Sequence, residues 1–302
     1  MDNTIKHIVE DYYKSILFLN VPNKCNNSCY YCYANPDFSN SSFIPYVTLE
    51  SVKGLLAIVK ELGFNELRIS GGEPLIYSNI CDLISNAINL GFEYSIITNG
   101  MLLETHMRIL TSTKPKKVSV SYNSYDNWHI IPGSRVDNGL LDYCITRLIA
   151  FDVSTSINIV VLKENLAYIL SIITRLYGFG IREFKLIFPN SSLSGISERD
   201  YSSILYDLSC ECIDANVRVS DLSYKHCLLK ERGFVHIILP KMQFSNCCLN
   251  TNKHNSIKLS EGSSIDNVKE TMLNMYNAAH KEFACRTKLE FCPIALKQLS
   301  DV

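Results

Sequence analysis

The sequence lacks any run of about 18 consecutive apolar residues, the length that a helix needs to cross the hydrocarbon core of a bilayer. It also lacks an excess of charge of one sign, since 29 basic and 30 acidic residues leave a net charge of −1. This balance gives no overall electrostatic attraction to nucleic acid or to an anionic membrane surface. Residues 1–14 mix charged and polar side chains without the apolar core of a secretory signal. We therefore expect a cytoplasmic protein with neither a nucleic-acid nor a membrane partner.

Paired zinc-binding cysteines are missing too, because no second C-x2-C unit follows the one at residues 29–32. Yet the chain has twelve cysteines, and in a reducing cytosol thiols serve metals or catalysis rather than disulfides. Cys25, Cys29 and Cys32 follow the apolar segment 15–21 at the spacing C-x3-C-x2-C. Three thiolates on one loop can hold three irons of a [4Fe–4S] cluster and leave the fourth iron open to a small molecule. At this point, three unrelated thiols or a partial zinc site remain the alternative.

Short apolar segments alternate with longer amphipathic ones between residues 15 and 189. The predicted strands are Ile16–Val21, Glu66–Ser70, Tyr94–Thr98, Lys117–Ser121, Thr155–Val161 and Glu183–Phe188. The predicted helices are Leu49–Leu62, Ile80–Leu90, Thr105–Thr111, Asn138–Phe151, Leu166–Tyr177 and, beyond a Ser/Gly-rich loop, Glu198–Ala215. Such alternation predicts an α/β fold of parallel units, and six units favour an open (β/α)6 partial barrel over a closed eight-fold one. Ligands of these sheets bind at the carboxyl ends of the strands.

The second predicted strand ends in a Gly-Gly-Glu-Pro segment, residues 71–74. By itself this segment predicts a strand-to-helix turn. Some forty residues earlier, Tyr31 supplies an aromatic side chain directly before the third thiol of the cysteine loop. Together the two segments resemble the radical S-adenosylmethionine (SAM) superfamily, which has a C-x3-C-x-aromatic-C loop and a GGEP motif. The resemblance also implies the partial-barrel fold.

The resemblance implies a [4Fe–4S] cluster, SAM bound at its open iron, and reductive cleavage of SAM to a 5′-deoxyadenosyl radical that takes a hydrogen atom from a substrate. A reductant such as flavodoxin or ferredoxin is the implied electron donor. The implied ligands of the cluster are Cys25, Cys29 and Cys32. Candidate SAM contacts are Tyr31, Gly71, Gly72, Glu73, Pro74, Asn99, Ser119, Ser121, Ser156 and Asn158. For the polar residues at strand ends, a turn or plain solvent exposure is an equal alternative.

A second group of cysteines lies in the last 56 residues, namely Cys247, Cys248, Cys285 and Cys292. With an apolar segment, a Gly turn and an amphipathic helix near Asp266–Phe283, this group resembles the SPASM and twitch extensions of radical SAM enzymes. It departs from the SPASM pattern because no cysteine follows Gly262. We expect a partial-barrel domain at residues 1–215 and a small C-terminal domain at 216–302 that holds one auxiliary [4Fe–4S] cluster. The alternative is a set of buried or incidental thiols.

The motifs do not encode the fate of the substrate radical after hydrogen abstraction. Extensions of this kind are common in maturases of ribosomally made peptides, so the leading hypothesis is a peptide-modifying enzyme that forms a cross-link or epimerises a residue. Cys227 is the candidate hydrogen donor, with Cys210 and Cys212 as alternatives, although each thiol alone is more often structural. Only some fifteen residues precede the first strand, which counts against a leader-dependent maturase, or implies a separate binding partner or a leader that contacts the barrel itself.

Two other interpretations remain open. One is a twitch-type small-molecule dehydrogenase or a cofactor-biosynthesis cyclase, although the chain has no C-terminal Gly-Gly motif and no basic cluster suited to a nucleoside triphosphate. The other is a non-catalytic Fe–S electron carrier, which would leave the six β/α units and the GGEP segment without a purpose.

Overall fold

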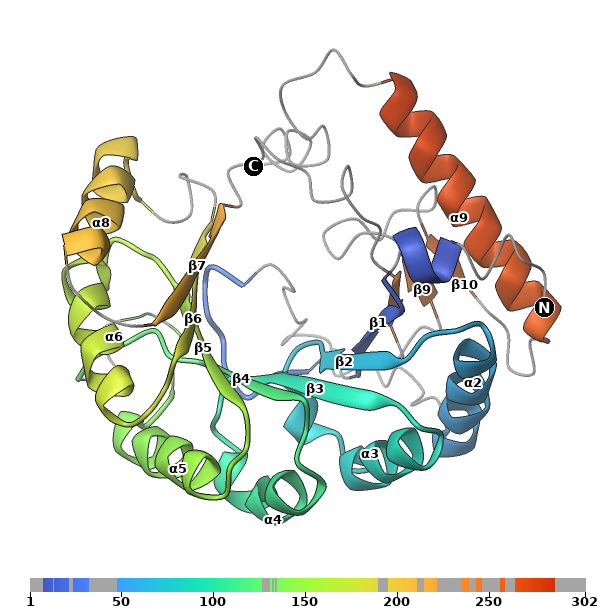
Figure 1. Ribbon diagram of the computed structural model, residues 1–302, viewed down its shortest axis with the longest axis horizontal. Coiled ribbons are helices and arrows are strands. Elements are labelled where there is room, and N and C mark those ends of the chain that lie inside the picture. Colours follow the sequence, from blue (N-terminus) through green and yellow to red (C-terminus); the bar gives the residue numbers. More distant parts are fainter. Residues whose placement is uncertain are drawn as a thin grey trace. The chain divides into compact units, whose positions relative to one another are not determined.

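The chain alternates between strands and helices along most of its length (Figure 1). The computed structural model describes residues 8–12, 14–21, 24–32, 48–126, 131, 133, 135–189, 195–210, 215–221, 235–238, 243–245, 256–258 and 264–285. Its strands are β1 (Ile16–Asn20), β2 (Glu66–Ser70), β3 (Glu93–Thr98), β4 (Lys117–Ser121), β5 (Thr155–Val160), β6 (Glu183–Phe188), β7 (Asn216–Asp221), β8 (Val235–Ile238), β9 (Gln243–Ser245) and β10 (Ser256–Lys258). Its helices are α2 (Leu49–Glu61), α3 (Ile80–Asn89), α4 (Leu103–Thr113), α5 (Asn138–Ala150), α6 (Ile169–Gly178), α8 (Glu198–Cys210) and α9 (Ile265–Cys285), with short turns η1 (Ile8–Tyr12), η2 (Pro74–Ile76) and η3 (Leu166–Tyr168).

All six predicted strands form, and each begins and ends within one residue of its predicted bounds. The predicted helices form as well, although the one expected from residue 166 begins as the 3-10 turn η3 before continuing as α6. The last one, α8, ends at Cys210, and its predicted end, Ala215, is not helical. Local signals explain this agreement. Thr48, for example, caps α2 by accepting a hydrogen bond from the Ser51 amide at 3.2 Å, as a threonine at this position is expected to do. The amphipathic helix expected near Asp266–Phe283 is also confirmed, as α9.

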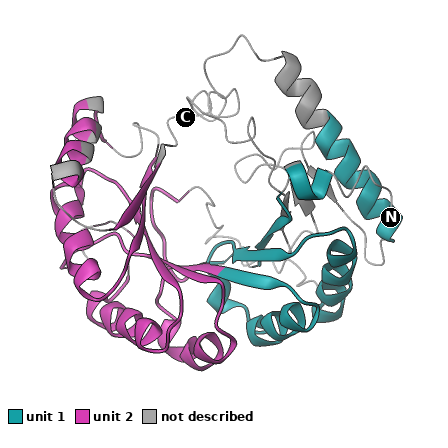
Figure 2. Ribbon diagram, viewed as in Figure 1, with its two compact units in different colours: residues 1–25, 33–95, 225–302 teal, residues 26–32, 96–224 magenta. Residues whose placement is uncertain are grey.

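The chain divides into two compact units (Figure 2), each of which has its own strand pairing. The first consists of residues 1–25, 33–95 and 225–302. Within it, β1 pairs in parallel with β2 on one side and with β8 on the other, while β8–β9 and β9–β10 are antiparallel pairs. Strands β8 and β9 were not predicted, because runs of three or four residues carry too little periodicity to be recognised. Strand β10 overlaps the apolar segment that the resemblance to SPASM-like extensions implied from residue 257.

The second unit consists of residues 26–32 and 96–224. Its strands β4, β5, β6 and β7 are all parallel, and β7 is an addition to the predicted set. Alternate residues of β4 to β6 are buried and apolar, such as Val120, Ile159 and Leu186, and these form the core on one face of the sheet. The opposite face carries more polar side chains, beginning with Ser119 and Ser156.

The domain boundary expected after residue 215 was placed where the amino-acid composition changes. The two units described above are defined instead by their spatial compactness, so they do not test it. That boundary stays a prediction. Within the part of the chain that the structure describes, no helix has both the length and the apolar character needed to span a bilayer.

Candidate functional site

The cluster loop, residues 24–32, follows β1 and carries the first three cysteines. The thiols of Cys25, Cys29 and Cys32 are all half-buried, so each keeps some access to solvent. The Cys32 amide donates to the Cys29 carbonyl at 3.1 Å, which places these two cysteines on one tight turn. Burial raises the pKa of the Cys29 thiol, while a hydrogen bond with the Tyr31 side chain acts in the opposite direction. Binding of a metal to these cysteines would favour their deprotonated thiolate form.

The Gly-Gly-Glu-Pro turn packs directly against the start of this loop. The Glu73 amide donates to the Lys24 carbonyl at 2.9 Å. A Cβ atom placed on Gly72 would lie 2.2 Å from the same carbonyl oxygen and 3.3 Å from the Cys25 nitrogen. Only a residue without a side chain allows this approach, so the sequence motif and the cysteine loop are brought together by backbone contact.

Within the same turn, the Glu73 side chain is fully buried and caps η2. Its Oε1 accepts a hydrogen bond from the Leu75 amide at 3.1 Å, and Pro74 occupies the first position of this 3-10 turn. The expected role of the Glu73 carboxylate toward the SAM amino group stays a prediction, as does a contact of SAM with Gly71, Gly72 or Pro74.

In the second unit, Asn99 at the carboxyl end of β3 holds the cluster loop. Its Nδ2 donates to the Asn26 side-chain oxygen at 2.7 Å, and its Oδ1 accepts from the Met101 amide at 3.0 Å. The sequence identified Asn99 as a candidate SAM contact, with an Asn-Gly turn as the alternative. The structure gives its side chain a defined local task, which is to tie the cluster loop to the turn after β3.

The segment between β4 and α5 provides two further anchors for the loop. Asn27 accepts a hydrogen bond from the Arg135 amide at 2.8 Å through its side-chain oxygen. The Ser28 amide donates to the Gly133 carbonyl at 3.0 Å. Gly133 has a φ of +82°, and a Cβ there would lie 2.0 Å from the Ser28 carbonyl oxygen, so both the backbone conformation and the space require glycine.

The two adjacent tyrosines of the cluster loop form separate contacts. The Tyr30 hydroxyl donates to the Glu164 carboxylate, with distances of 3.0 and 3.1 Å to its two oxygens. Burial and this carboxylate raise the pKa of Tyr30 to about 12. The Tyr31 hydroxyl accepts a hydrogen bond from Asn123 Nδ2 at 2.7 Å, and burial followed by the proximity of Cys29 raises its pKa. The residues following β4 and β5 thus hold both aromatic side chains of the loop.

The remaining SAM candidates lie side by side on β4 and β5. Ser119 stands opposite Ser156, and their hydroxyl oxygens are 2.9 Å apart. Ser121 stands opposite Asn158 in the same register. Because successive residues of a strand face opposite ways, the four side chains share one face of the sheet, as the period-two spacing predicted. Their contact with SAM stays a prediction.

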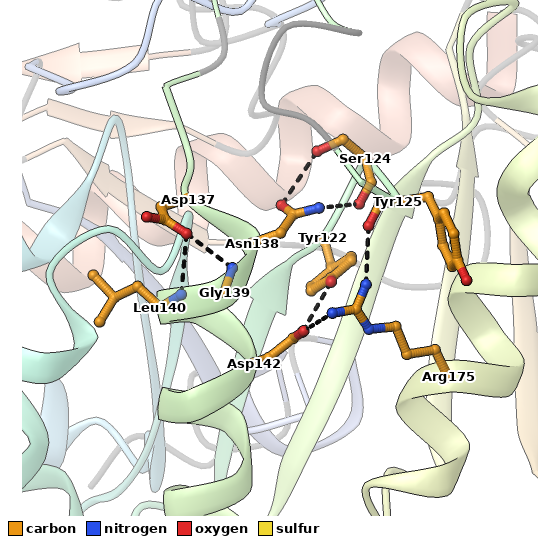
Figure 3. A network of polar contacts seen from close by, with 9 residues as sticks. All are labelled: Tyr122, Ser124, Tyr125, Asp137, Asn138, Gly139, Leu140, Asp142 and Arg175. Atoms are coloured by element: carbon orange, nitrogen blue, oxygen red, sulfur yellow. Dashed lines mark hydrogen bonds and ion pairs between the residues drawn. The ribbon is translucent and has the colours of Figure 1, made fainter.

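A buried polar network supports the loop that follows β4 (Figure 3). Asp142 of α5 accepts a hydrogen bond from the Tyr122 hydroxyl at 2.8 Å and forms an ion pair with Arg175 of α6. Arg175 also donates to the Tyr125 carbonyl at 3.1 Å, and its guanidinium lies 5.7 Å from the ring centroid of that tyrosine. Asn138 donates to the Ser124 carbonyl at 2.7 Å. Residues 122–125 are consequently fixed from two helices at once.

Several predicted residues lie outside the described part of the chain. These are the candidate hydrogen donor Cys227 and the candidate auxiliary-cluster ligands Cys247, Cys248 and Cys292. Cys285 is the last residue of α9, and only its backbone is described. The auxiliary cluster and the role of Cys227 stay predictions.

Comparison with known proteins identifies the family. The family model of the Radical SAM superfamily matches residues 19–176, which is more than half of the chain and includes the end of β1, the cluster loop and β2 to β5. The chain belongs to the Radical SAM superfamily. This family implies a [4Fe–4S] cluster and SAM, and the match favours an enzyme over the electron carrier considered as an alternative.

Its curated relatives include proteins named as GTP 3′,8-cyclases. One from Methanothermobacter thermautotrophicus, described as probable, is 33% identical over 109 residues, covering 36% of this chain and 35% of the relative. One from Clostridium perfringens is 31% identical over 156 residues, covering 49% of this chain and 47% of the relative. The chain thus spans about a third to a half of the length of these curated relatives.

Several solved structures share the fold at lower identity. Streptococcus suis SuiB bound to the precursor peptide SuiA has a TM-score of 0.64 and 16% identity, covering 81% of this chain and 62% of that one. The structure of anSMEcpe with bound AdoMet and the Cp18Cys peptide has a TM-score of 0.63 and 14% identity, covering 88% of this chain and 81% of that one. With the parallel β/α units, this likeness confirms the predicted α/β partial-barrel fold.

The residues of this radical SAM enzyme fit the cluster that the family implies. In the described residues, no three His, Cys, Asp or Glu side chains converge on a single metal ion. A cubane cluster needs no such convergence, because each thiolate binds a different iron. Three half-buried thiols on one loop, held by backbone contact with the Gly72 turn, supply that donor set.

Sequence reasoning missed the residues that anchor the cluster loop, namely Asn26, Asn27, Asn123, Glu164 and Asn165. Each is an ordinary polar residue near a loop, and each has at least one hydrogen-bond partner in a distant part of the sequence. The one usable signal was position, because Asn123 and Glu164 lie shortly after the ends of predicted strands, where ligands of such sheets bind.

Proposed function

We propose that Cys25, Cys29 and Cys32 hold a [4Fe–4S] cluster with one open iron, and that the enzyme binds SAM there and abstracts a hydrogen atom from a substrate. When bound and reduced, the cluster supplies the electron that cleaves SAM to a 5′-deoxyadenosyl radical. The observation that carries the proposal is the cluster loop itself, whose thiols are half-buried and whose remaining residues are hydrogen-bonded at several points.

The protein's own contribution is to fix this loop and to orient the ligands around it. The anchors at Asn99, Gly133 and Asn123 hold residues 26–32, and Gly72 lets the second strand's turn approach Cys25. The polar face of β4 and β5, with Ser119 and Ser156, offers hydroxyl groups of the kind that bind ribose or carboxylate oxygens. Such fixed donors and acceptors position a substrate C–H bond without reorganisation during the reaction.

The direct test is cleavage of SAM by the reconstituted protein. We expect the anaerobically reconstituted and dithionite-reduced enzyme to form 5′-deoxyadenosine from SAM, and Cys25→Ala, Cys29→Ala or Cys32→Ala to abolish it. Cys81→Ala is the matched control, since this exposed thiol lies in α3 outside the loop, and it should retain the activity. Cleavage that survives all three loop substitutions would overturn the proposal.

For the substrate, we propose a ribosomally made peptide that is cross-linked or epimerised. This is supported by the C-terminal cysteine group and by the fold shared with SuiB and anSMEcpe, both of which have structures with bound peptides. Mass loss of two hydrogens from a peptide encoded by a neighbouring reading frame would indicate a cross-link or oxidation. Incorporation of one solvent deuterium at a Cα would indicate epimerisation.

A second candidate is cofactor biosynthesis from a purine nucleotide. It is favoured by the curated relatives named as GTP 3′,8-cyclases, whose identity of 31–33% lies in aligned segments of 109 to 156 residues. Incubation of the reduced enzyme with SAM and GTP distinguishes the candidates. Consumption of GTP matched by 5′-deoxyadenosine would favour the cyclase, and unchanged GTP beside a modified peptide would favour the maturase.

A further inference from the structure

Two basic residues of the second unit occupy paired positions on neighbouring strands. Lys185 of β6 stands opposite Arg218 of β7 in the parallel register, and both residues are exposed. The backbones of such neighbours are about 4.8 Å apart, and paired side chains project from the same face of the sheet. The two residues lie far apart in the sequence, so the sequence alone does not reveal the pair.

The pair lies on the polar face of the sheet. Phe184 and Leu186, which flank Lys185 in β6, are buried and project from the opposite face, where α5 and α6 pack in Figure 1. The polar face also carries the candidate SAM contacts of β4 and β5. The two cations and the expected SAM site therefore share one side of the sheet.

Within that face, the two cations complete a row of side chains across four strands. Ser121 is paired with Asn158, which in turn is paired with Lys185. With Arg218, the row consists of a hydroxyl, an amide, an ammonium and a guanidinium group, all of which can donate hydrogen bonds. It contains no carboxylate. The row therefore offers an anion several donors and two positive charges.

The row nearer the amino ends of the strands differs in that its polar groups pair with protein side chains. The hydroxyl oxygens of Ser119 and Ser156 are 2.9 Å apart. Glu183, which precedes Lys185 by two residues on the same face, forms an ion pair with Lys117 of β4. The acidic side chain closest to the two cations along β6 is thus already engaged by another cation.

The chemistry of the two cations suits an oxyanion. Like charges at paired positions repel each other, and a negative group between them replaces this repulsion by two attractions. Arginine presents a planar fork that matches two oxygens of a carboxylate or a phosphate, whereas lysine adds a compact charge. Hydrogen bonds between ionised partners are also stronger than those between neutral ones.

We propose that Lys185 and Arg218 bind an oxyanion of the substrate, a carboxylate or a phosphate group, beside the end of the row where SAM contacts are expected. The inference rests on the proposed function, because it assigns the occupant to the substrate of that reaction. It adds the charge of the substrate. A peptide would present an acidic side chain or its terminal carboxylate to the pair, and a nucleotide would present its phosphates.

The test is calorimetric titration of the full-length reconstituted protein, under anaerobic conditions and at low ionic strength, with two probes. The probes are inorganic pyrophosphate and the peptide triglutamate. We expect the wild type to bind at least one of them, and Lys185→Gln and Arg218→Gln each to weaken that binding about tenfold or more. Arg218→Lys keeps the charge and should weaken it less than Arg218→Gln does. Binding of neither probe by the wild type would overturn the inference.

Lys114→Gln is the matched control. It removes one positive charge from the same unit, but Lys114 precedes β4 at the amino end of the strand and pairs with Asp152 at the surface. Its affinity for the probes should equal that of the wild type. A loss as large as that in Lys185→Gln and Arg218→Gln would reveal a general effect of net charge and contradict a site at the pair.

The two probes distinguish the possible sources of the oxyanion. Tighter binding of triglutamate indicates an acidic peptide, and tighter binding of pyrophosphate indicates a nucleotide. SAM itself carries a carboxylate, so the titration is repeated with saturating SAM. Simultaneous binding of probe and SAM supports a substrate site. Displacement of the probe by SAM would assign the pair to SAM and refute the inference.

This inference and the proposed function can fail separately, because probe binding is measured without any cleavage of SAM. A wild-type protein that forms 5′-deoxyadenosine but binds neither probe refutes only the oxyanion site. A wild-type protein that binds a probe through Lys185 and Arg218 but cleaves no SAM refutes the proposed function, and with it the assignment of the occupant to a substrate.

Discussion

Single residues of this enzyme are constrained most tightly where two backbones approach each other. Gly72 is the clearest case, because the space that a Cβ would need is already filled by the Lys24 carbonyl group at 2.2 Å. Its φ lies outside the left-handed region, so the constraint is one of space alone. A backbone carbonyl next to a cysteine of the cluster loop cannot move away as a flexible side chain could.

Gly72→Ala should therefore displace the start of the cluster loop. We expect it to lower the iron content after reconstitution to well below half that of the wild type and to lower the free energy of unfolding by about 1–3 kcal/mol. Iron analysis and thermal unfolding of the purified proteins measure the two effects.

Gly54→Ala provides the comparison, since nothing lies within 4 Å of a Cβ at this position in α2. Alanine in a helix interior should raise the free energy of unfolding by about 0.5–1 kcal/mol and leave the iron content unchanged. Iron loading of Gly72→Ala equal to that of Gly54→Ala would show that the contact has no bearing on the cluster loop.

At the residue scale, the sequence identified the cysteines and the glycines as candidates, but not the residues that hydrogen-bond to the cluster loop. Chemistry identifies a thiol or a Gly-Gly turn by itself, whereas Asn26 is meaningful only through Asn99, 73 positions away. Asn123 likewise depends on Tyr31, which is 92 positions away. Side-chain pairs of this kind are set by tertiary packing, which short-range patterns do not encode.

Between elements, the network around Asp142 fixes how α5 and α6 hold the loop after β4 (Figure 3). Asp142 keeps only 12% of its side chain exposed, while Arg175 keeps 31%. Loss of the carboxylate would leave the Tyr122 hydroxyl and the Arg175 guanidinium without their shared acceptor. Removing one member of a buried pair costs more than the pair itself contributes, because the other member stays desolvated.

Asp142→Ala should thus lower the free energy of unfolding by about 2 kcal/mol, a value reduced for the partial access of water to Arg175. Chemical denaturation measures it. Glu50→Ala is the control, since this carboxylate is 81% exposed and pairs with Lys53 at the surface, so its loss should cost no more than about 0.5 kcal/mol. Similar costs for the two variants would mean that burial of Asp142 is energetically unimportant.

The same carboxyl group should give stability a pH dependence. Burial raises the pKa of Asp142 above its ordinary value of 3.8, although Tyr122 and Arg175 oppose the change. A raised pKa means that the folded state binds the proton more tightly than the unfolded state. This contribution to stability is therefore complete below the unfolded pKa and is lost as the pH rises through the folded one.

Asp142→Asn does not titrate at this position and serves as the reference. The free energy of unfolding of the wild type minus that of Asp142→Asn should decrease as the pH rises from about 3 to about 7. Denaturant titrations across this range check the sign. An increase with pH would show that the ion pair with Arg175 outweighs the cost of burial.

For the whole molecule, the order of strands and helices was predictable because each unit of this fold is local in the sequence. A strand, a turn and a helix are adjacent in the chain, and hydrophobic periodicity with caps such as Thr48 marks their bounds. The short strands β8 and β9 were not predictable, since three or four residues join a sheet through partners elsewhere in the chain.

The whole chain should carry two clusters if the auxiliary site exists. We expect about 8 irons per chain after anaerobic reconstitution, and about 4 in the triple variant Cys248→Ala/Cys285→Ala/Cys292→Ala. Iron and sulfide analysis measure both. About 4 irons in the wild type would rule out the auxiliary cluster while leaving the cluster of the first three cysteines in place.

The long sequence separations of the loop contacts set an order of events during synthesis. Hydrogen bonds from residues 26–31 reach partners 73 to 134 positions further along the chain. A ribosome that has just released Cys32 must therefore add well over a hundred residues before these partners emerge. Until then the nascent thiols have only their neighbours to hold them. We therefore expect iron to reach the proposed cluster only after translation through the fifth strand and its turn.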